Sequence, residues 1–435
     1  MLLIHSPSIP NRLLYITDLM VTKILGIEVR LTASPEEFTG YDGPKFSYAN
    51  TMISDGLFIE ASGFLFDIDL TFQDVTSDVV DGVPVIFKSV DPLSALPFDP
   101  FAAAFYMVSR YEEYQPLRKD SFGRYPATES IAWKCKFLDI PVVHKWAAML
   151  EQLLLKHLPQ LKFVHRRYNF VPTIDIDHAW CYLGRTLSRT MGGFGRSLAQ
   201  GRFREIHGRF KTLTGLAPDP YDTYAYINSV QEPYGVLPLW FILFADYGTN
   251  DNNVTVTSRS FHRLLRELDR YGSVGIHPSL SSNKHFEKLE DEYDGLCDVL
   301  NRDVTISRQH FLKISWPKTY RNLIQFGITD DYSMGYASHI GFRAGIAIPF
   351  RFFDLARDEI TNLMIHPVAV MDVTLKDYLR LNKVESLEKI ESMINTIRSI
   401  GGEFVSLWHN ESLSGTGHWR GWKEVYEKMV AMAST

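Results

Sequence analysis

The sequence has little cysteine and no long apolar run. Its three cysteines, Cys135, Cys181 and Cys297, lie far apart in 435 residues, a set too sparse for a disulfide framework or a thiolate zinc site. No apolar run approaches the roughly 20 residues that a membrane span needs. The N-terminus has no basic segment followed by a long apolar stretch. We therefore expect a soluble protein without a transmembrane segment that acts in the cytoplasm.

Strong charge of either sign is also lacking. The formal net charge is -6, which is mild for this length, so nucleic acid is not an expected partner. Hydrophobic residues at 45% and charged residues at 22% are the values of an ordinary folded globular protein. Because 435 residues exceed what one domain usually holds, two domains are expected.

The first 165 residues are predicted to form a smaller α/β domain. A basic, proline-containing passage at 158–167 marks its end, which divides the chain into an accessory domain, 1–165, and a second domain, 166–435. Short strands and amphipathic helices are expected in the first domain, at 2–5, 27–31, 11–25, 99–114 and 142–157. No set of catalytic residues is recognisable there.

The second domain alternates strands with helices. The continuous apolar run 237–244 is typical of a fully buried parallel strand. About seven such strands alternate with amphipathic helices, which predicts βα units around a largely parallel sheet or barrel. Seven strands are too few for a regular eight-stranded barrel but enough for an incomplete one.

Two carboxylates stand together in the stretch Phe170-Val-Pro-Thr-Ile-Asp-Ile-Asp-His-Ala179. In an extended strand, residues two apart point to the same face, so Asp175 and Asp177 face one way while Ile174 and Ile176 enter a core. Two like charges about 6–7 Å apart on an apolar strand are costly to bury without a positive partner. A metal ion, an arginine or a shared proton would meet that need.

Titratable residues also follow the later strands. In parallel βα folds, chemistry gathers at the carboxyl ends of the strands. The strand-end residues are Asp175, Asp177, His277, Arg308, His310, Asp330, Asp331 and His409. A carboxylate and one or two imidazoles can hold a divalent ion and leave positions for water and a substrate oxygen. The set therefore indicates metal-assisted hydrolysis, with a second carboxylate as base and a histidine as acid.

In the order of these motifs, residues 170–430 resemble the NodB-homology polysaccharide deacetylases, carbohydrate esterase family 4. The matching motifs are Thr173-Ile-Asp-Ile-Asp177, Gly275-Ile-His-Pro-Ser279, Ser307-Arg-Gln-His310, Asp330-Asp331 and Leu407-Trp-His409. The resemblance implies an irregular (β/α)7 barrel. It also implies a metal site. It further implies a catalytic set that comprises a base, an arginine that orients the base, and an acid. By similarity, the catalytic residues are Asp175, Arg308 and His409, and the first two metal ligands are Asp177 and His277.

This chain departs from the family pattern at two places. Ile176 separates the two aspartates, which are adjacent in the common motif, and Ser281 stands where the histidine motif supplies its second histidine. We expect His310 to complete the metal shell, with His178 and Ser281 as the other candidates. Zinc is the expected ion, with cobalt, nickel and iron as alternatives. If none of these residues serves, the barrel becomes a catalytically inactive glycan-binding or scaffold protein.

Aromatic and polar residues near the strand ends are the expected substrate-binding wall. A glycine- and aromatic-rich loop follows Asp331, and further candidates follow the last strand. Stacking on such side chains is typical of sugar sites. The expected substrate-binding residues are Tyr332, Tyr336, Arg343, Trp408 and Asn410.

Residues 184–211 carry seven basic side chains against one acid, Glu205, with three glycines that predict a loop in the middle. They form either a solvated helical insertion or a contact for an anionic substrate or membrane surface. The leading hypothesis is removal of N-acetyl groups from a saccharide, on a lipid- or nucleotide-linked intermediate. Hydrolysis of a non-sugar amide is the other enzymatic alternative.

Overall fold

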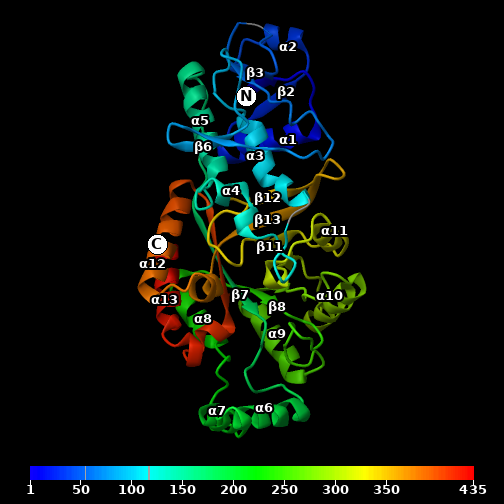
Figure 1. Ribbon diagram of the computed structural model, residues 1–435, viewed down its shortest axis with the longest axis vertical. Helices are drawn as coiled ribbons and strands as arrows, with labels where there is room; N and C mark the ends of the chain where they lie inside the picture. The colour runs from blue at the N-terminus through cyan, green and yellow to red at the C-terminus, as the bar shows by residue number, and fades with distance from the viewer. Residues whose placement is uncertain (54, 116–117) are drawn as a thin grey trace.

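The computed structural model describes residues 1–53, 55–115 and 118–435. The molecule is elongated (Figure 1), with the N-terminal part at one end, a barrel in the middle and a helical hairpin at the far end. Among the residues that the structure describes, no helix has both the length and the apolar character that crossing a bilayer requires.

The N-terminal part is built on a small parallel sheet. Its strands are β1 (Leu2–His5), β2 (Val29–Thr32), β3 (Lys45–Ala49) and β4 (Phe58–Glu60), in the order β2-β1-β3-β4. A two-stranded antiparallel hairpin is added by β5 (Ser77–Val80) and β6 (Val83–Ile86). The helices are α1 (Asn11–Thr17), α2 (Pro35–Gly40), α3 (Pro100–Val108), α4 (Ile131–Lys134) and α5 (Val142–His157). The expected smaller α/β region is therefore present.

Helix α3 begins as predicted but ends early. The side chain of Asp99 accepts hydrogen bonds from the backbone N–H groups of Phe101 and Ala102, which caps the helix start. The prediction that the helix continues to residue 114 is wrong, because Arg110 takes a left-handed conformation with φ of 55°. That turn breaks the helix and aims the Arg110 side chain toward the barrel.

Seven parallel strands close into a barrel. They are β7 (Asn169–Ile176), β8 (Leu239–Ile242), β9 (Ser273–Ile276), β10 (Ile306–Ser307), β11 (Asp330–Met334), β13 (Glu359–Met371) and β14 (Glu403–His409). Pairing runs β11-β10-β9-β8-β7-β14-β13, and β11 also pairs with β13, which closes the ring. The short β12 (Phe350–Asp354) adds an antiparallel partner to β13. The prediction of an irregular (β/α)7 barrel is confirmed.

Helices cover the outside of the barrel (Figure 1). They are α8 (Tyr224–Gln231), α9 (Arg259–Tyr271), α10 (Phe286–Leu300), α11 (Lys318–Gln325), α12 (Lys383–Ser399) and α13 (Trp422–Ser434). On β7, Ile174 and Ile176 are fully buried in the main hydrophobic core, whereas Asp175 contributes to the wall of an inner cavity. The period-two alternation expected of this strand therefore places its carboxylates inside the barrel.

The far end of the molecule is a hairpin of α6 (Leu187–Ala199) and α7 (Phe203–Leu213), inserted after β7. The glycines at 192, 193 and 195 were expected to form a loop, but α6 runs through all three. A Cβ on Gly193 would lie 2.5 Å from the NH1 atom of Arg209 on α7. Glycine at this position therefore leaves room for the Arg209 guanidinium and does not form a turn.

Buried ion pairs join the N-terminal part to the barrel. Glu113 accepts hydrogen bonds from Arg343 at 2.5 and 2.9 Å and from Arg110 at 2.8 Å. Burial opposes ionisation of this carboxyl, but the two arginines outweigh it and lower the pKa of Glu113 to about 2. The two parts also share one hydrophobic core. The division of the chain into domains 1–165 and 166–435 remains a prediction.

Asp330 and Asp331 were expected at the carboxyl end of their strand, but they lie at its start. Asp330 is the first residue of β11 rather than its last, because the strand extends to Met334. Asp330 accepts a hydrogen bond from His366, and Asp331 is fully buried against the hydroxyls of Ser307 and Ser333. Neither aspartate lines the cavity that Asp175 lines.

His366 bridges two strands at the end of the barrel remote from that cavity. Its Nδ1 atom lies 2.7 Å from Glu403 and its Nε2 atom 2.9 Å from Asp330. Burial opposes the charged imidazole, but hydrogen bonds and charges from both carboxylates prevail and raise the pKa of His366 from 6.5 to about 9. The bridge is therefore charged at neutral pH.

This bridge predicts a pH dependence of stability. Because the folded-state pKa lies above the unfolded value, its stabilisation is complete below pH 6.5 and is lost as the pH rises through about 9. His366→Gln should lower the free energy of unfolding by roughly 2–3 kcal/mol at pH 6 and much less at pH 10. Urea unfolding of both proteins across this range measures the difference, and a difference independent of pH would contradict the charged bridge.

Candidate metal centre

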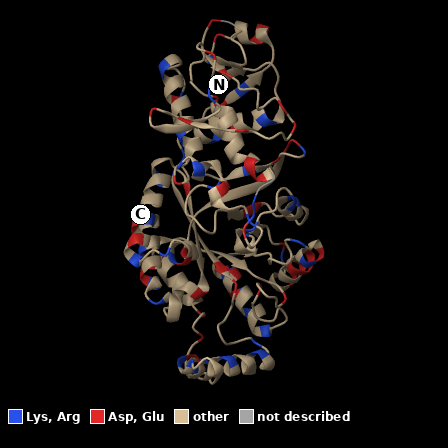
Figure 2. Cartoon of the chain, viewed as in Figure 1, with Lys and Arg blue, Asp and Glu red and all other residues tan. Residues whose placement is uncertain are grey.

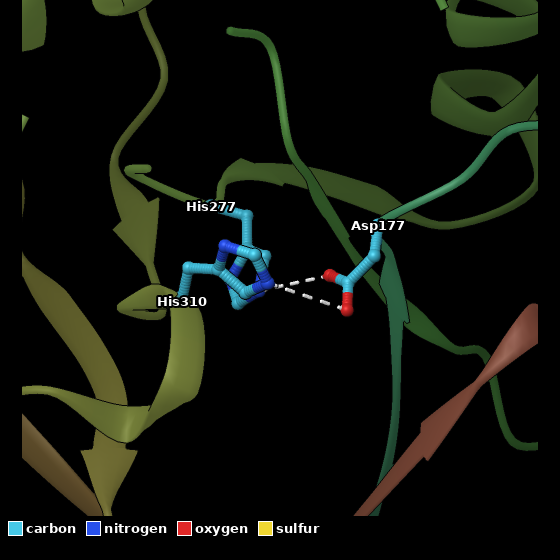
Figure 3. Close-up of side chains that lie close together, drawn as sticks. All are labelled: Asp177, His277 and His310. Atoms are coloured by element: carbon cyan, nitrogen blue, oxygen red, sulfur yellow. Dashed lines mark ion pairs between the residues drawn. The ribbon is translucent and has the colours of Figure 1, made fainter. Parts of the chain in front are cut away.

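Three side chains converge at the carboxyl ends of the barrel strands (Figure 3). Asp177 follows β7, His277 follows β9 and His310 follows β10. The Nε2 atom of His277 lies 3.2 Å from Oδ1 of Asp177, and the Nε2 atom of His310 lies 3.4 Å from Oδ2. One potential ligand atom from each residue lies within 4.8 Å of the others. The strands thus bring together the three residues expected to bind a metal.

Each imidazole of the cluster is held by its other nitrogen. The Nδ1 atom of His277 lies 2.6 Å from the carbonyl oxygen of Arg308, and the Nδ1 atom of His310 lies 2.9 Å from Oδ1 of Asp251. Both acceptors favour a proton on Nδ1, which leaves the lone pair of Nε2 directed at Asp177. This arrangement is typical of histidine metal ligands, whose outer partners fix the tautomer and the ring orientation.

The spacing of the donors fits a divalent ion. Two atoms that each lie about 2.0–2.2 Å from one tetrahedral ion are about 3.3–3.6 Å apart. The two nitrogen–oxygen distances above are of this size, and they reach the two different oxygens of Asp177. Oδ1 of Asp177 is also buried without a hydrogen-bond partner among the described residues, a costly state that an ion relieves. One carboxylate and two imidazoles suit zinc, cobalt, nickel and iron.

Without an ion, charge within the cluster is balanced by protons. Burial opposes the charged ring of His310, but Asp177 and Asp251 outweigh it and raise the pKa of His310 to about 9. Burial likewise opposes ionisation of Asp177, yet His310, His277 and His409 hold the pKa of Asp177 well below its usual range. Metal binding would therefore release a proton from His310.

The other two candidates for the third ligand lie outside the cluster. Nδ1 of His178 lies 3.0 Å from Glu411. The hydroxyl of Ser281 accepts a hydrogen bond from Lys288 at 2.7 Å, and Ser281 lines a different cavity. The geometry therefore favours His310 for this position.

The second strand carboxylate, Asp175, is held by an arginine. Arg308 donates from NH1 to Oδ1 of Asp175 at 2.7 Å and to the hydroxyl of Thr173 at 2.6 Å, and its Nε donates to the carbonyl of Tyr332. The guanidinium also lies over the Phe241 ring, 4.4 Å from the centroid. The other Asp175 oxygen lies 3.7 Å from Nε2 of His277, at the edge of the metal cluster.

His409, at the end of β14, reaches the cluster from the opposite side of β7. Its backbone N–H donates to one Asp372 oxygen at 2.8 Å, and its Nδ1 lies 2.8 Å from the other. Its Nε2 lies 3.8 Å from Oδ2 of Asp177. Burial opposes protonation, but Asp372 together with Asp177 and Asp175 raises the pKa of His409 well above its usual value. Asp372 therefore orients the ring, and the three carboxylates favour its protonated form.

One cavity of about 210 Å³ is lined by the two aspartates and three histidines, Asp175, Asp177, His277, His310 and His409. Part of its wall is apolar, formed by residues such as Phe311, Leu312 and Met371. Arg124 also lines it, although it comes from the N-terminal part of the chain. Its Nε donates to Asp120 at 2.7 Å, and its two terminal nitrogens donate to the Phe311 carbonyl and the Tyr378 hydroxyl, both at 3.2 Å. Sequence reasoning missed Arg124 as well as Asp251.

The five residues expected to bind substrate do not line the cavity of the metal cluster. Trp408, Tyr332 and Asn410 are buried and do not line the cavity. Trp408 packs against Tyr426 of α13, Tyr332 stacks on His366, and the Asn410 amide donates to backbone carbonyl groups.

Tyr336 and Arg343 are also buried, at the contact with the N-terminal part, where both interact with Arg110 or Glu113. They line a neighbouring cavity of about 280 Å³, and its wall also includes Arg124. Arg343 is thus used for an ion pair within the fold. Direct contact of these five residues with a substrate at the metal site has no support in this geometry.

Comparison with known proteins finds one family model and several solved structures that are similar to this chain. A family model described as a family of unknown function (DUF7033) matches residues 2–159. No curated protein is matched. Among solved structures, the chain is similar to a protein assigned as a polysaccharide deacetylase from Mycobacterium smegmatis, with 14% identity, 62% of this chain and 85% of that chain covered, and a TM-score of 0.41.

Two further solved structures are similar at 9% identity. One is a polysaccharide deacetylase from Bacillus cereus, with 60% of this chain and 86% of that chain covered and a TM-score of 0.30. The other is PuuE allantoinase, with 62% and 84% covered and a TM-score of 0.38. Because these identities and TM-scores are low, the likenesses carry no argument about activity.

The candidate metal site predicts which substitutions weaken zinc binding. His310→Ala should lower the affinity for zinc more than tenfold because it removes one of three ligands, and Asp251→Asn should lower it about 10- to 100-fold because it releases the ligand ring. Competition titration with a chelating dye measures both affinities. His178→Ala is the matched control and should keep the parent affinity. Loss of binding in the control with retention in His310→Ala would make His178 the third ligand.

Proposed function

We propose that this protein is a divalent-metal-dependent hydrolase that removes N-acetyl groups from an amino sugar or glycan. The observation that carries the proposal is the cluster of Asp177, His277 and His310 at the carboxyl ends of the barrel strands. An arginine-held carboxylate and a carboxylate-held histidine flank that cluster. The order of these residues along the chain is the order of the family motifs that the sequence resembles.

The roles follow from position and hydrogen bonding. A divalent ion held by the cluster would polarise the amide carbonyl and acidify a water molecule. Asp175 accepts the proton of the attacking water, and the Arg308 guanidinium keeps that carboxylate oriented toward the site. His409 donates a proton to the leaving amine, and Asp372 fixes its ring for that transfer. Zinc is the proposed ion, with cobalt, nickel and iron equally compatible with the ligands.

The competing hypotheses have less support. A catalytically inactive glycan-binding protein was suggested by Ser281 in the place of a second histidine, but His310 supplies an imidazole to the same cluster. Hydrolysis of a non-sugar amide uses the same polar groups, so a cyclic amide belongs in the substrate panel. The enzyme hypothesis is therefore preferred, with a saccharide as the substrate.

The setting of the reaction is also a proposal. Cys135, Cys181 and Cys297 are unpaired, as is usual in a reducing compartment, and we place the step in the cytoplasm during the assembly of a surface glycan. We propose that a lipid or nucleotide carries the saccharide and that the basic segment 184–211 makes the contact with its anionic part or with a membrane surface. Excess positive charge in that segment supports this assignment.

Acetate release from N-acetylhexosamines and their short oligomers tests the activity. Asp175→Asn and His409→Gln should each lower kcat about 10²- to 10⁴-fold, the usual contribution of a general base or acid. Both should keep their bound zinc because neither residue belongs to the metal cluster. Metal content and acetate are measured on the same preparations.

Ser281→Ala provides the control for this experiment. Ser281 occupies the position where the family motif has a histidine, yet its hydroxyl hydrogen-bonds to Lys288 and to no other described side chain, so kcat should stay at the parent value. Absence of acetate across the panel from zinc-loaded parent protein, with Asp175→Asn indistinguishable from it, would overturn the proposed activity.

A further inference from the structure

A second, larger cavity lies under the α6–α7 hairpin, at the end of the molecule remote from the N-terminus. Its volume is about 960 Å³. Figure 2 shows lysines and arginines along the hairpin. The arginines that line the cavity are Arg185, Arg189, Arg196, Arg202 and Arg209. A single carboxylate, Glu205, lines it within the part of the chain that the structure describes.

Arg209 is buried in this wall without an anionic partner. The residue is only 7% exposed, and its Nε and NH1 atoms have no hydrogen-bond partner among the described residues. Its guanidinium lies between the rings of Tyr182 and Phe194, at 4.8 and 5.5 Å from their centroids. A buried, unpaired guanidinium is costly, so its donors indicate a ligand that the fold leaves room for.

The remaining charges do not neutralise Arg209. One oxygen of Glu205 accepts a hydrogen bond from Ser197 at 3.0 Å, and the other pairs with Arg202 at 3.2 Å. Arg189 donates to two backbone carbonyls and lies 4.1 Å from the Tyr247 centroid. The cavity therefore keeps a surplus of guanidinium groups, whose planar pairs of donors match phosphate oxygens.

The two cavities adjoin each other. His178 and Asn252 line both the arginine cavity and the cavity of the metal cluster. A molecule held by its phosphate beneath the hairpin can therefore extend a neighbouring sugar ring toward Asp177 and His277. This continuity links the arginines to the same substrate rather than to an unrelated effector.

The opposite faces of the two helices are apolar and exposed. On α6, Leu187, Met191 and Leu198 follow the spacing of one helix face, and they are 79%, 61% and 62% exposed. Phe203 and Phe210 continue this pattern on α7, at 69% and 55% exposed. Arg189 and Arg196 lie on the other side of α6, toward the cavity. Amphipathic helices with this division of apolar and basic faces are typical of elements that lie in a membrane interface.

We propose that the arginine cavity is a phosphate subsite for a lipid-linked saccharide and that the outer face of the hairpin rests on the bilayer carrying that lipid. The inference deepens the proposed deacetylase function and rests on it. It assigns the phosphate of the substrate to Arg209 and its neighbours, the sugar to the metal cavity, and the lipid chain to the membrane. A soluble nucleotide carrier would use the same arginines but not the apolar face.

Binding of inorganic phosphate to the full chain, measured by isothermal titration calorimetry at low ionic strength, tests the subsite. Arg209→Gln and the exposed Arg196→Gln should each weaken binding about tenfold, since each removes charge-assisted hydrogen bonds. Arg204→Gln removes the same charge from α7 outside the cavity lining and should leave phosphate affinity at the parent value. Circular dichroism and thermal unfolding verify that each variant is folded.

A metal-site variant distinguishes this anion site from an ion at the cluster. Asp177→Ala should bind phosphate as the parent does, because the arginines do not depend on the metal. Loss of phosphate binding in Asp177→Ala with retention in Arg209→Gln and Arg196→Gln would overturn the subsite. Phosphate binding with no acetate released from any substrate would overturn the deacetylase proposal and leave the subsite standing.

Sedimentation with vesicles identifies the carrier. The parent protein should associate with vesicles of equal parts phosphatidylcholine and phosphatidylglycerol. Changing Leu187 and Phe203 to serine together should reduce that association severalfold, because it removes apolar area from the interface. Uridine diphosphate serves as the soluble probe in the calorimeter. Tight binding of uridine diphosphate by a protein that ignores the vesicles would overturn the lipid assignment.

Discussion

The barrel depends on the need to balance two carboxylates two residues apart, the buried Asp175 near the end of β7 and the partly buried Asp177 directly after that strand. Asp175 and Asp177 both line the inner cavity, whereas Ile174 and Ile176 between and before them enter the core. Removing an ion from water costs several kcal/mol even after the protein relaxes. Positive groups must therefore come from other strands: Arg308 after β10 for Asp175, and for Asp177 the histidines that follow β9 and β10 and the one that ends β14. Closure of the ring brings these strands to one place.

Hydrogen bonds from the surrounding residues also hold these groups in place. The three imidazoles within 4 Å of Asp177, those of His277, His310 and His409, each have the remote nitrogen within hydrogen-bond distance of a fixed acceptor. These acceptors are the Arg308 carbonyl, Asp251 and Asp372. Arg308 serves twice, since its side chain holds Asp175 while its carbonyl holds His277. Such preorganisation means that little rearrangement is needed when charge develops during a reaction. The fold thus fixes distances among groups that come from distant parts of the sequence.

The residues of the candidate site could be predicted from the sequence wherever the direction of a strand alone determines their position. Parallel strands end on the same side of a barrel, so the geometry could bring together Asp177, His277, His310 and His409 from strand ends alone. Positions could not be predicted where they depend on the exact bounds of a strand, on which face of the strand a side chain takes, or on a contact with a distant loop. Asp330 was placed at the wrong end because β11 begins rather than ends there. Trp408 faces α13 because side chains alternate along β14. Asp251 and Arg124 come from loops whose position no periodicity predicts.

The contact between the N-terminal part and the barrel limits how this protein can evolve. Arg343, on a loop of the barrel, is neutralised by Glu113 from the other part, and Arg124 completes the wall of the metal cavity. Recombination that transferred residues 166–435 alone to another gene would strip Arg343 of its counter-charge and open one side of the cavity. An intact metal cavity is therefore expected only when both parts are present, whereas the α6–α7 hairpin at the opposite end already interrupts the strand–helix repeat.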